Sequence, residues 1–134
     1  KFAHKYYDEI GLGIDFTARD LQNKLKDKGL PWEKSKCFDG SAVIGEKWIP
    51  KKELKDVNTI DFSLSQNGNI VQQSNTQYML WKIDELIAYI SQFFTLKIGD
   101  VIFTGTPEGV GKVAINDNLV GKIGDTQIFD INVK

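Results

Sequence analysis

The sequence predicts an α+β fold with a mixed or mostly antiparallel sheet, and three observations lead to this class. Segments with the period-two alternation of strands outnumber segments with helical spacing. Only residues 18–28 and 82–94 are predicted to form helices. An Asn67-Gly68 pair separates two alternating segments, which is a strong sign of a β-hairpin.

The first part of the chain is expected to hold a strand followed by a helix. Residues 9–16 alternate loosely between apolar and polar, which predicts a strand. Thr17 and Asp20 have the spacing of a capping box, so the helix over 18–28 is expected to begin just after Thr17. Gly29 follows the helix as an end signal, and lysines near that end suit the helix dipole.

The remaining elements follow from hydrophobic periodicity and from turn residues. The helix over 82–94 rests on apolar residues at helical spacing, namely Ile83, Leu86, Ile87, Ile90 and Phe94. The other predicted strands cover residues 43–44, 60–65, 70–71, 101–104 and 127–133. Loops are expected at 29–42 and, rich in glycine, at 105–111.

The composition excludes several classes of function. The net charge is −1 and aromatic residues do not interleave with a basic patch, so neither nucleic acid nor a membrane surface is an expected partner. No apolar run approaches the roughly 20 residues that span a bilayer. Cys37 is the only cysteine, which excludes an internal disulfide and suits a reducing compartment; we expect the cytoplasm.

Three polar residues near the first helix are the strongest candidates for chemistry. Asp15, Arg19 and Gln22 are spaced by four and three residues, a spacing that places side chains on one helical face. Asp15 is expected at the end of the preceding strand. An acid there, beside a polar helix start, suggests a metal or substrate site. The alternative is a capped surface helix with an intrahelical ion pair.

Two further segments carry candidate groups. In the loop 105–111, glycines allow close backbone approach to a ligand and Thr106 offers a hydroxyl, although a simple Gly-rich turn would look the same. Lys36, partly shielded by neighbouring aromatic residues, is placed to meet a carboxylate or an enolate. Cys37 is expected to be a packing residue, because His4 is the only histidine and lies far away in sequence.

Four motifs occur in an order that resembles a known family. They are Asp15-Phe-Thr-Ala-Arg-Asp-Leu-Gln22, Gly29-Leu-Pro-Trp32, Lys36 with Phe38-Asp39, and Leu96-Lys-Ile-Gly-Asp-Val-Ile-Phe-Thr-Gly-Thr-Pro-Glu-Gly-Val-Gly111. Together they closely resemble the fumarylacetoacetate hydrolase family, nearest to its small acylpyruvase and oxaloacetate decarboxylase-like branch. The resemblance extends from about residue 3 to the end of the chain.

The resemblance implies a fold, a cofactor and a reaction class. The fold would be a mixed β-sandwich roll, and the protein a homodimer. The cofactor would be a divalent metal, usually Mg²⁺, with Mn²⁺ or Ca²⁺ as alternatives. The substrate would be a small 2-oxo acid, changed by C–C bond hydrolysis, decarboxylation or tautomerisation through a metal-bound enolate.

The resemblance also assigns roles to single residues. Asp15 would be a metal ligand, while Arg19, Gln22 and Lys36 would be active-site residues. Arg19 and Lys36 would also bind the substrate. Gly105 and Thr106, in the Gly-Thr-Pro turn, would hold the substrate carboxylate. All these side chains are expected to line one cavity.

One departure from the family pattern limits what this chain is expected to do alone. The family's other metal ligands, two glutamates in a Glu-x-Glu motif, and its catalytic His and Glu should lie upstream of residue 1. We therefore expect residues 1–134 to be a single catalytic-type domain that is incomplete at its N-terminus. Because one carboxylate does not hold Mg²⁺, metal binding is expected to be poor unless that segment is supplied. The alternative is an inactive fragment or a dimer-forming binding module.

Overall fold

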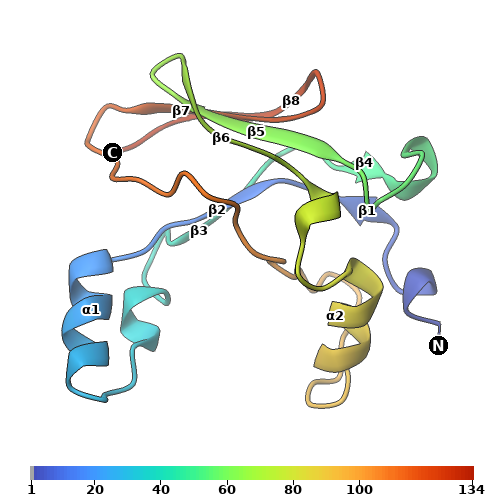
Figure 1. The fold of residues 1–134 in the computed structure, drawn as a ribbon, viewed down its shortest axis with the longest axis horizontal. Coiled ribbons are helices and arrows are strands. Elements are labelled where there is room, and N and C mark those ends of the chain that lie inside the picture. Colours follow the sequence, from blue (N-terminus) through green and yellow to red (C-terminus); the bar gives the residue numbers. More distant parts are fainter. Residues whose placement is uncertain (1) are drawn as a thin grey trace. The chain divides into compact units, whose positions relative to one another are not determined.

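The computed structural model describes residues 2–134, which divide into two compact units (Figure 1). The larger unit comprises residues 2–12 and 45–134, and the smaller unit comprises residues 13–44. Within the described residues, every helix is too short or too polar to cross a bilayer.

The smaller unit holds a short two-stranded ladder and one α-helix. Its elements are β2 (Gly13–Asp15), α1 (Arg19–Asp27), the 3₁₀ helix η2 (Glu33–Ser35) and β3 (Ala42–Ile44). Strands β2 and β3 are antiparallel, with Ile14 opposite Val43. The helix predicted over 18–28 and the short strand predicted at 43–44 are therefore confirmed. The strand predicted over 9–16 is divided at Gly11 and Leu12, and only its second half belongs to this unit.

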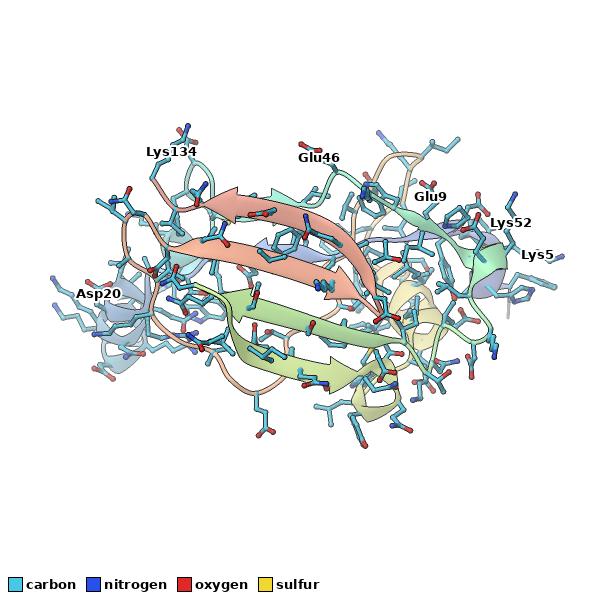
Figure 2. The ribbon with its side chains drawn as sticks, turned by 90° about the horizontal axis from the view of Figure 1, so that it is seen from above. Lys5, Glu9, Asp20, Glu46, Lys52 and Lys134 are labelled. Carbon is cyan, nitrogen blue, oxygen red and sulfur yellow. The ribbon has the colours of Figure 1, made fainter. Side chains whose placement is uncertain are left out.

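The larger unit is built on a four-stranded antiparallel sheet in the order β6-β5-β7-β8, whose strands lie side by side in Figure 2. These strands are β5 (Asp61–Gln66), β6 (Asn69–Asn75), β7 (Asn118–Ile123) and β8 (Thr126–Asn132). A second ladder pairs β1 (Glu9–Ile10) with β4 (Ile49–Pro50). The helices are α2 (Ile83–Ile90) and the 3₁₀ helices η1 (Ala3–Lys5), η3 (Lys51–Glu53) and η4 (Thr76–Tyr78).

The hairpin predicted at Asn67-Gly68 is confirmed. Asn67 has φ 52° and Gly68 has φ 83°, so both residues adopt the left-handed region that a type I′ turn requires. Glycine and asparagine reach this region at low cost, whereas other side chains meet the backbone there. The turn therefore sets the register in which β5 and β6 pair.

The core of the larger unit consists of apolar side chains from the sheet, from α2 and from Ile60. The buried apolar side chains are Ile60, Ile83, Ile87, Leu119, Ile123, Ile128 and Phe129, all in the larger unit. Ile83 and Ile87 are four residues apart and so lie on one face of α2. The helix ends at Ile90, four residues earlier than predicted, and Phe94 lies beyond it with an exposed ring.

One predicted strand is absent from the structure, and one strand of the four-stranded sheet was missed. Residues 101–104 form no strand, because no described strand pairs with them, and Val101 and Phe103 are exposed. Strand β7 was not predicted, because Gly121 occupies an inward position where alternation would call for an apolar residue. A Cβ on Gly121 would lie 2.3 Å from the Phe129 ring, so the ring fills the space of the missing side chain.

Candidate functional site

Asp15 ends strand β2, as predicted. Its backbone is held by the pairing with Ala42, and the next residue, Phe16, donates its N–H to the Ser41 carbonyl at 2.7 Å. The ladder thus fixes the position from which the Asp15 carboxylate projects. Half of that side chain is exposed, which leaves it open to an ion or a ligand.

Lys36 points its ammonium group at Asp15. The Lys36 Nζ atom lies 2.6 Å from Asp15 Oδ2 and also donates to Thr17 Oγ1 at 2.6 Å. The Lys36 side chain is 28% exposed, so the ammonium is partly withdrawn from water. Lys36 thus contacts a carboxylate of the chain itself, while its role in a site stays a prediction. Neighbouring Trp32 instead accepts Lys26 over its ring, at 5.0 Å from the centroid.

The 3₁₀ helix η2 holds the backbone next to Lys36. Ser35 is fully buried, and its hydroxyl donates to the Trp32 carbonyl at 2.6 Å. The Ser35 carbonyl in turn accepts the N–H of Ala18 at 3.0 Å, just before α1 begins. This bond ties the loop of Lys36 to the start of the helix. The backbone from which the Lys36 side chain reaches Asp15 is therefore held in place by hydrogen bonds.

The predicted capping box is wrong. Helix α1 begins at Arg19 with Ala18 as its N-cap, and no side chain caps it. Thr17 lies one residue before the N-cap, and its hydroxyl oxygen accepts the Lys36 ammonium. A hydrogen bond from a charged donor is stronger than one from a backbone N–H, so this long-range contact holds the Thr17 hydroxyl firmly.

Arg19 and Gln22 contact each other on α1. Arg19 Nη1 donates to Gln22 Oε1 at 2.7 Å, and Gln22 is 4% exposed. Their shared helical face, predicted from spacing, is therefore confirmed. The only ion pair within the described residues joins Lys36 to Asp15, so the intrahelical ion pair of the alternative reading is not formed there.

Thr106 and Gly105 lie in the predicted Gly-rich loop of the larger unit. One side chain of β6 contacts this loop three times: Gln72 Nε2 donates to Thr106 Oγ1 at 3.1 Å, to the Pro107 carbonyl at 3.2 Å and to the Glu108 carbonyl at 3.3 Å. Gly105 has φ 121°, a value that favours glycine. The loop is thus positioned from the sheet.

Gly109 brings the same loop onto β6. Its φ is 92°, and a Cβ there would lie 2.1 Å from the Val71 carbonyl oxygen, so no other residue fits. The loop backbone consequently lies in close contact with the strand that carries Gln72.

The predicted site residues fall into two groups. Asp15, Arg19, Gln22 and Lys36 belong to the smaller unit, and the structure brings them together in two contacting pairs. Thr106, with Gly105, belongs to the larger unit. The expectation that all of them line one cavity stays a prediction.

Asp15 supplies a suitable ligand atom for a divalent cation, but a single one. Among residues 2–134, no three His, Cys, Asp or Glu side chains gather closely enough to hold a metal. Mg²⁺ takes near-octahedral oxygen coordination, usually with more than one carboxylate. The described residues therefore supply one ligand of a metal site and not a complete one.

Sequence reasoning missed three residues and misplaced one. The missed residues position functional groups through contacts that no local sequence pattern predicts; they are Thr17, Ser35 and Gln72. Thr17 falls within the Asp15–Gln22 motif, and this was the only available signal. Cys37 is exposed and free, so the expectation that it packs in the interior is wrong.

Comparison with known proteins identifies the relatives of this chain. The family model described as fumarylacetoacetate (FAA) hydrolase C-terminal matches residues 3–131. The Escherichia coli protein named oxaloacetate tautomerase YcgM is 49% identical over 110 residues, covering 81% of this chain and 50% of the relative. The human protein named oxaloacetate tautomerase FAHD1, mitochondrial, is 39% identical over 117 residues, covering 87% of this chain and 52% of the relative.

A solved structure shares the fold. The crystal structure of fumarylpyruvate hydrolase from Pseudomonas aeruginosa in complex with Mn²⁺ and pyruvate matches with a TM-score of 0.88 and 36% identity. The match covers 98% of this chain and 56% of that one. The chain thus spans about half the length of the relatives it matches, with 50% and 52% of the two tautomerases covered.

Proposed function

Because the chain belongs to the fumarylacetoacetate hydrolase family and has the α+β fold of that family, we propose that its full-length protein is a metal-dependent enzyme acting on small 2-oxo acids. Oxaloacetate is the first substrate to test, since two relatives are named oxaloacetate tautomerases. The reaction would be a tautomerisation, a decarboxylation or a C–C bond hydrolysis. The observation that carries the proposal is the 2.6 Å contact of Lys36 with Asp15, both at positions of the family motif.

Asp15 would be one ligand of a divalent cation, Mg²⁺ in the first instance, with Mn²⁺ or Ca²⁺ as alternatives. Its Oδ2 atom accepts the Lys36 ammonium, which leaves Oδ1 as the free ligand atom. Bound there with further oxygen ligands, the cation would supply Lewis-acid polarisation of the 2-oxo carbonyl. The Mn²⁺ in the crystal of the Pseudomonas relative supports a metal of this class.

Lys36 would stabilise negative charge that develops on the substrate. Its ammonium is partly withdrawn from water and held by two oxygen acceptors, so little reorganisation is needed when charge appears nearby. Arg19 would bind an anionic group of the substrate, because its Nη1 is oriented by Gln22 while the guanidinium keeps further donors. Gln22 would thereby position Arg19.

Thr106 and Gly105 would bind the substrate carboxylate. Thr106 offers a hydroxyl, and Gly105 leaves room for a ligand to approach the backbone, since nothing lies within 4 Å of where its Cβ would be. We further propose that residues 1–134 act as one catalytic-type domain.

The decisive experiment is a metal-dependent assay of the full-length protein with oxaloacetate and acylpyruvates. Asp15→Ala should lower metal-dependent turnover by about 100-fold or more, because the ligand is lost. Asp20→Ala is the matched control, since Asp20 is an exposed acid on α1 with no predicted role in metal or substrate binding, and it should keep the wild-type rate. Equal turnover of the two variants, or no turnover by the wild type, would contradict the proposal.

We also propose that the protein forms a homodimer in the cytoplasm. Large exposed apolar side chains occur throughout residues 80–115, including Leu80, Phe93, Phe94, Ile98, Val110 and Ile115. Exposed apolar surface of this extent is typical of a protein–protein interface. Light scattering after size exclusion should give twice the subunit mass. The free thiol of Cys37 supports a reducing compartment, and cell fractionation would test the cytoplasm.

A further inference from the structure

We propose that Gln72 is a positioning residue that keeps the Thr106 hydroxyl proton free for an anionic group of the substrate. The inference rests on the proposed function, in which Thr106 binds a carboxylate, and assigns to β6 a part in that binding. Gln72 itself touches the loop and not the substrate.

The contacts of Gln72 determine which end of its amide faces the loop. Two of its three partners, the Pro107 and Glu108 carbonyl oxygens, only accept hydrogen bonds. The amide nitrogen must therefore face the loop, because the amide oxygen would repel both carbonyls. Thr106 Oγ1, at 3.1 Å from the same nitrogen, is consequently held as an acceptor.

This orientation sets the polarity of the Thr106 hydroxyl. A hydroxyl has one proton to donate and two lone pairs that accept. Since Gln72 Nε2 occupies a lone pair, the proton remains for another partner. A carboxylate accepts such a proton well, and hydrogen bonds to an ionised acceptor are roughly twice as strong as neutral ones. The arrangement thus favours an anionic ligand group over a donor.

The loop does not depend on Gln72 alone for its place. Gly109 packs its backbone against the Val71 carbonyl of β6 so closely that a Cβ would lie 2.1 Å from the oxygen. Changing Gln72 should therefore alter hydrogen-bond polarity more than it alters the fold. A substitution at Gln72 can therefore be tested for its effect on ligand binding in a protein that still folds.

The informative substitution is Gln72→Glu, which keeps the shape of the side chain and removes its donor. The carboxylate would accept the Thr106 proton, reverse the polarity of the hydroxyl and place a negative charge beside the ligand. Gln73→Glu is the matched control. Gln73 is the next residue of β6, so its side chain lies on the opposite face, and it is exposed.

The full-length protein should be assayed with its metal and oxaloacetate, with denaturation curves to verify folding. Loss of a hydrogen bond to a charged group predicts a rise of about 10- to 100-fold in KM for Gln72→Glu, with a smaller change in kcat. Gln73→Glu should stay within about twofold of wild type, as surface changes do. Equal KM values for the two variants would overturn the inference.

A double-mutant cycle tests whether Gln72 acts through Thr106. In a Thr106→Val background, Gln72→Glu should raise KM clearly less than it does in the wild type, because the hydroxyl is absent and only the added negative charge still acts. The same large effect in both backgrounds would overturn the inference.

A calorimetric titration with pyruvate separates this inference from the proposed function. Pyruvate affinity that falls in Gln72→Glu but not in Gln73→Glu would support the role of Gln72 even if oxaloacetate turnover were absent, in which case only the proposed function fails. Equal pyruvate affinities, or no pyruvate binding by any of the proteins, would overturn the inference.

Discussion

The two units of the chain bury different kinds of side chain. Apart from glycines, the buried residues of the smaller unit are polar, namely Gln22, Ser35 and Ser41, whereas those of the larger unit are all apolar. Among the described residues, no buried side-chain nitrogen or oxygen lacks a hydrogen-bond partner. The smaller unit therefore achieves its order mainly through hydrogen bonds and an ion pair, and the larger unit through the removal of hydrocarbon from water.

This difference indicates that the two units contribute differently to the stability of the protein and to the placement of its functional groups. Apolar burial contributes about 25 cal/mol per Å² without regard to direction, so it stabilises the fold without fixing the direction of any single group. Buried polar groups add little net stability, but each one requires a partner at a defined distance. Gln22 has Arg19 as its partner and Ser35 has the Trp32 carbonyl. In the smaller unit, hydrogen bonds fix the positions of functional groups. In the larger unit, apolar burial supplies the free energy of folding.

Leu119→Ala should produce the largest change and should affect folding only. Leu119 is 1% exposed at the centre of the sheet, and a buried leucine replaced by alanine lowers the free energy of unfolding by about 2–5 kcal/mol. Urea denaturation would measure the loss. Ile70→Ala, an exposed apolar position in β6, should change it by less than about 0.5 kcal/mol. Similar values for both variants would show that apolar burial is not what stabilises the larger unit.

Lys36→Met should produce the reverse pattern, a large loss of turnover with little loss of stability. Removing one group that stabilises developing negative charge lowers kcat by about 10²- to 10³-fold. The ion pair with Asp15 is partly exposed, so its loss should lower stability by at most about 1 kcal/mol. The control in steady-state kinetics is Lys34→Met, because Lys34 is an exposed lysine of the adjoining 3₁₀ helix η2. A strongly destabilised but fully active variant would reverse our interpretation.

Thr17→Val should have a moderate effect on turnover. The variant loses the hydroxyl that accepts the Lys36 ammonium at 2.6 Å, so the ammonium becomes less well positioned and kcat should fall about tenfold. Thr17→Ser keeps the hydroxyl and should restore most of the rate, which a mere packing role would not predict. Failure of serine to rescue the rate would show that Thr17 acts through its methyl group.

Tyr7→Phe should have the smallest effect, confined to alkaline pH. Burial, followed by the nearby Asp84 carboxylate, raises the pKa of Tyr7 to about 12 from its ordinary value of 10.0. The folded state thus holds the phenol proton more tightly than the unfolded state. The resulting stabilisation is complete below pH 10 and is lost as the pH rises to about 12. Denaturation across this range should show a shallower decline in Tyr7→Phe than in wild type.

Tyr78→Phe provides the control for this measurement, because Tyr78 is exposed in the same unit. Its decline in stability at high pH should match that of the wild type. If Tyr7→Phe follows the wild-type curve as well, the tyrosine at position 7 is not responsible for the pH dependence.

The sequence by itself determined the local features of this protein. Asn67-Gly68 specified a turn because its backbone angles suit few other residues, and the helical spacing from Ile83 to Ile90 specified α2. Asp15 at a strand end, and Arg19 with Gln22 on one face, followed from spacing as well. The family roles of Lys36 and Thr106 came from motif resemblance and remain proposals.

Only the tertiary structure decided which groups meet across long separations. Lys36 and Asp15 are 21 residues apart, and Gln72 and Thr106 are 34 apart. It also decided that Thr17 serves Lys36 and does not cap α1, and that Gly121 makes room for Phe129. The physical reason is that periodicity and turn chemistry act over a few residues, whereas a side chain's hydrogen-bond partner depends on the path of the whole chain.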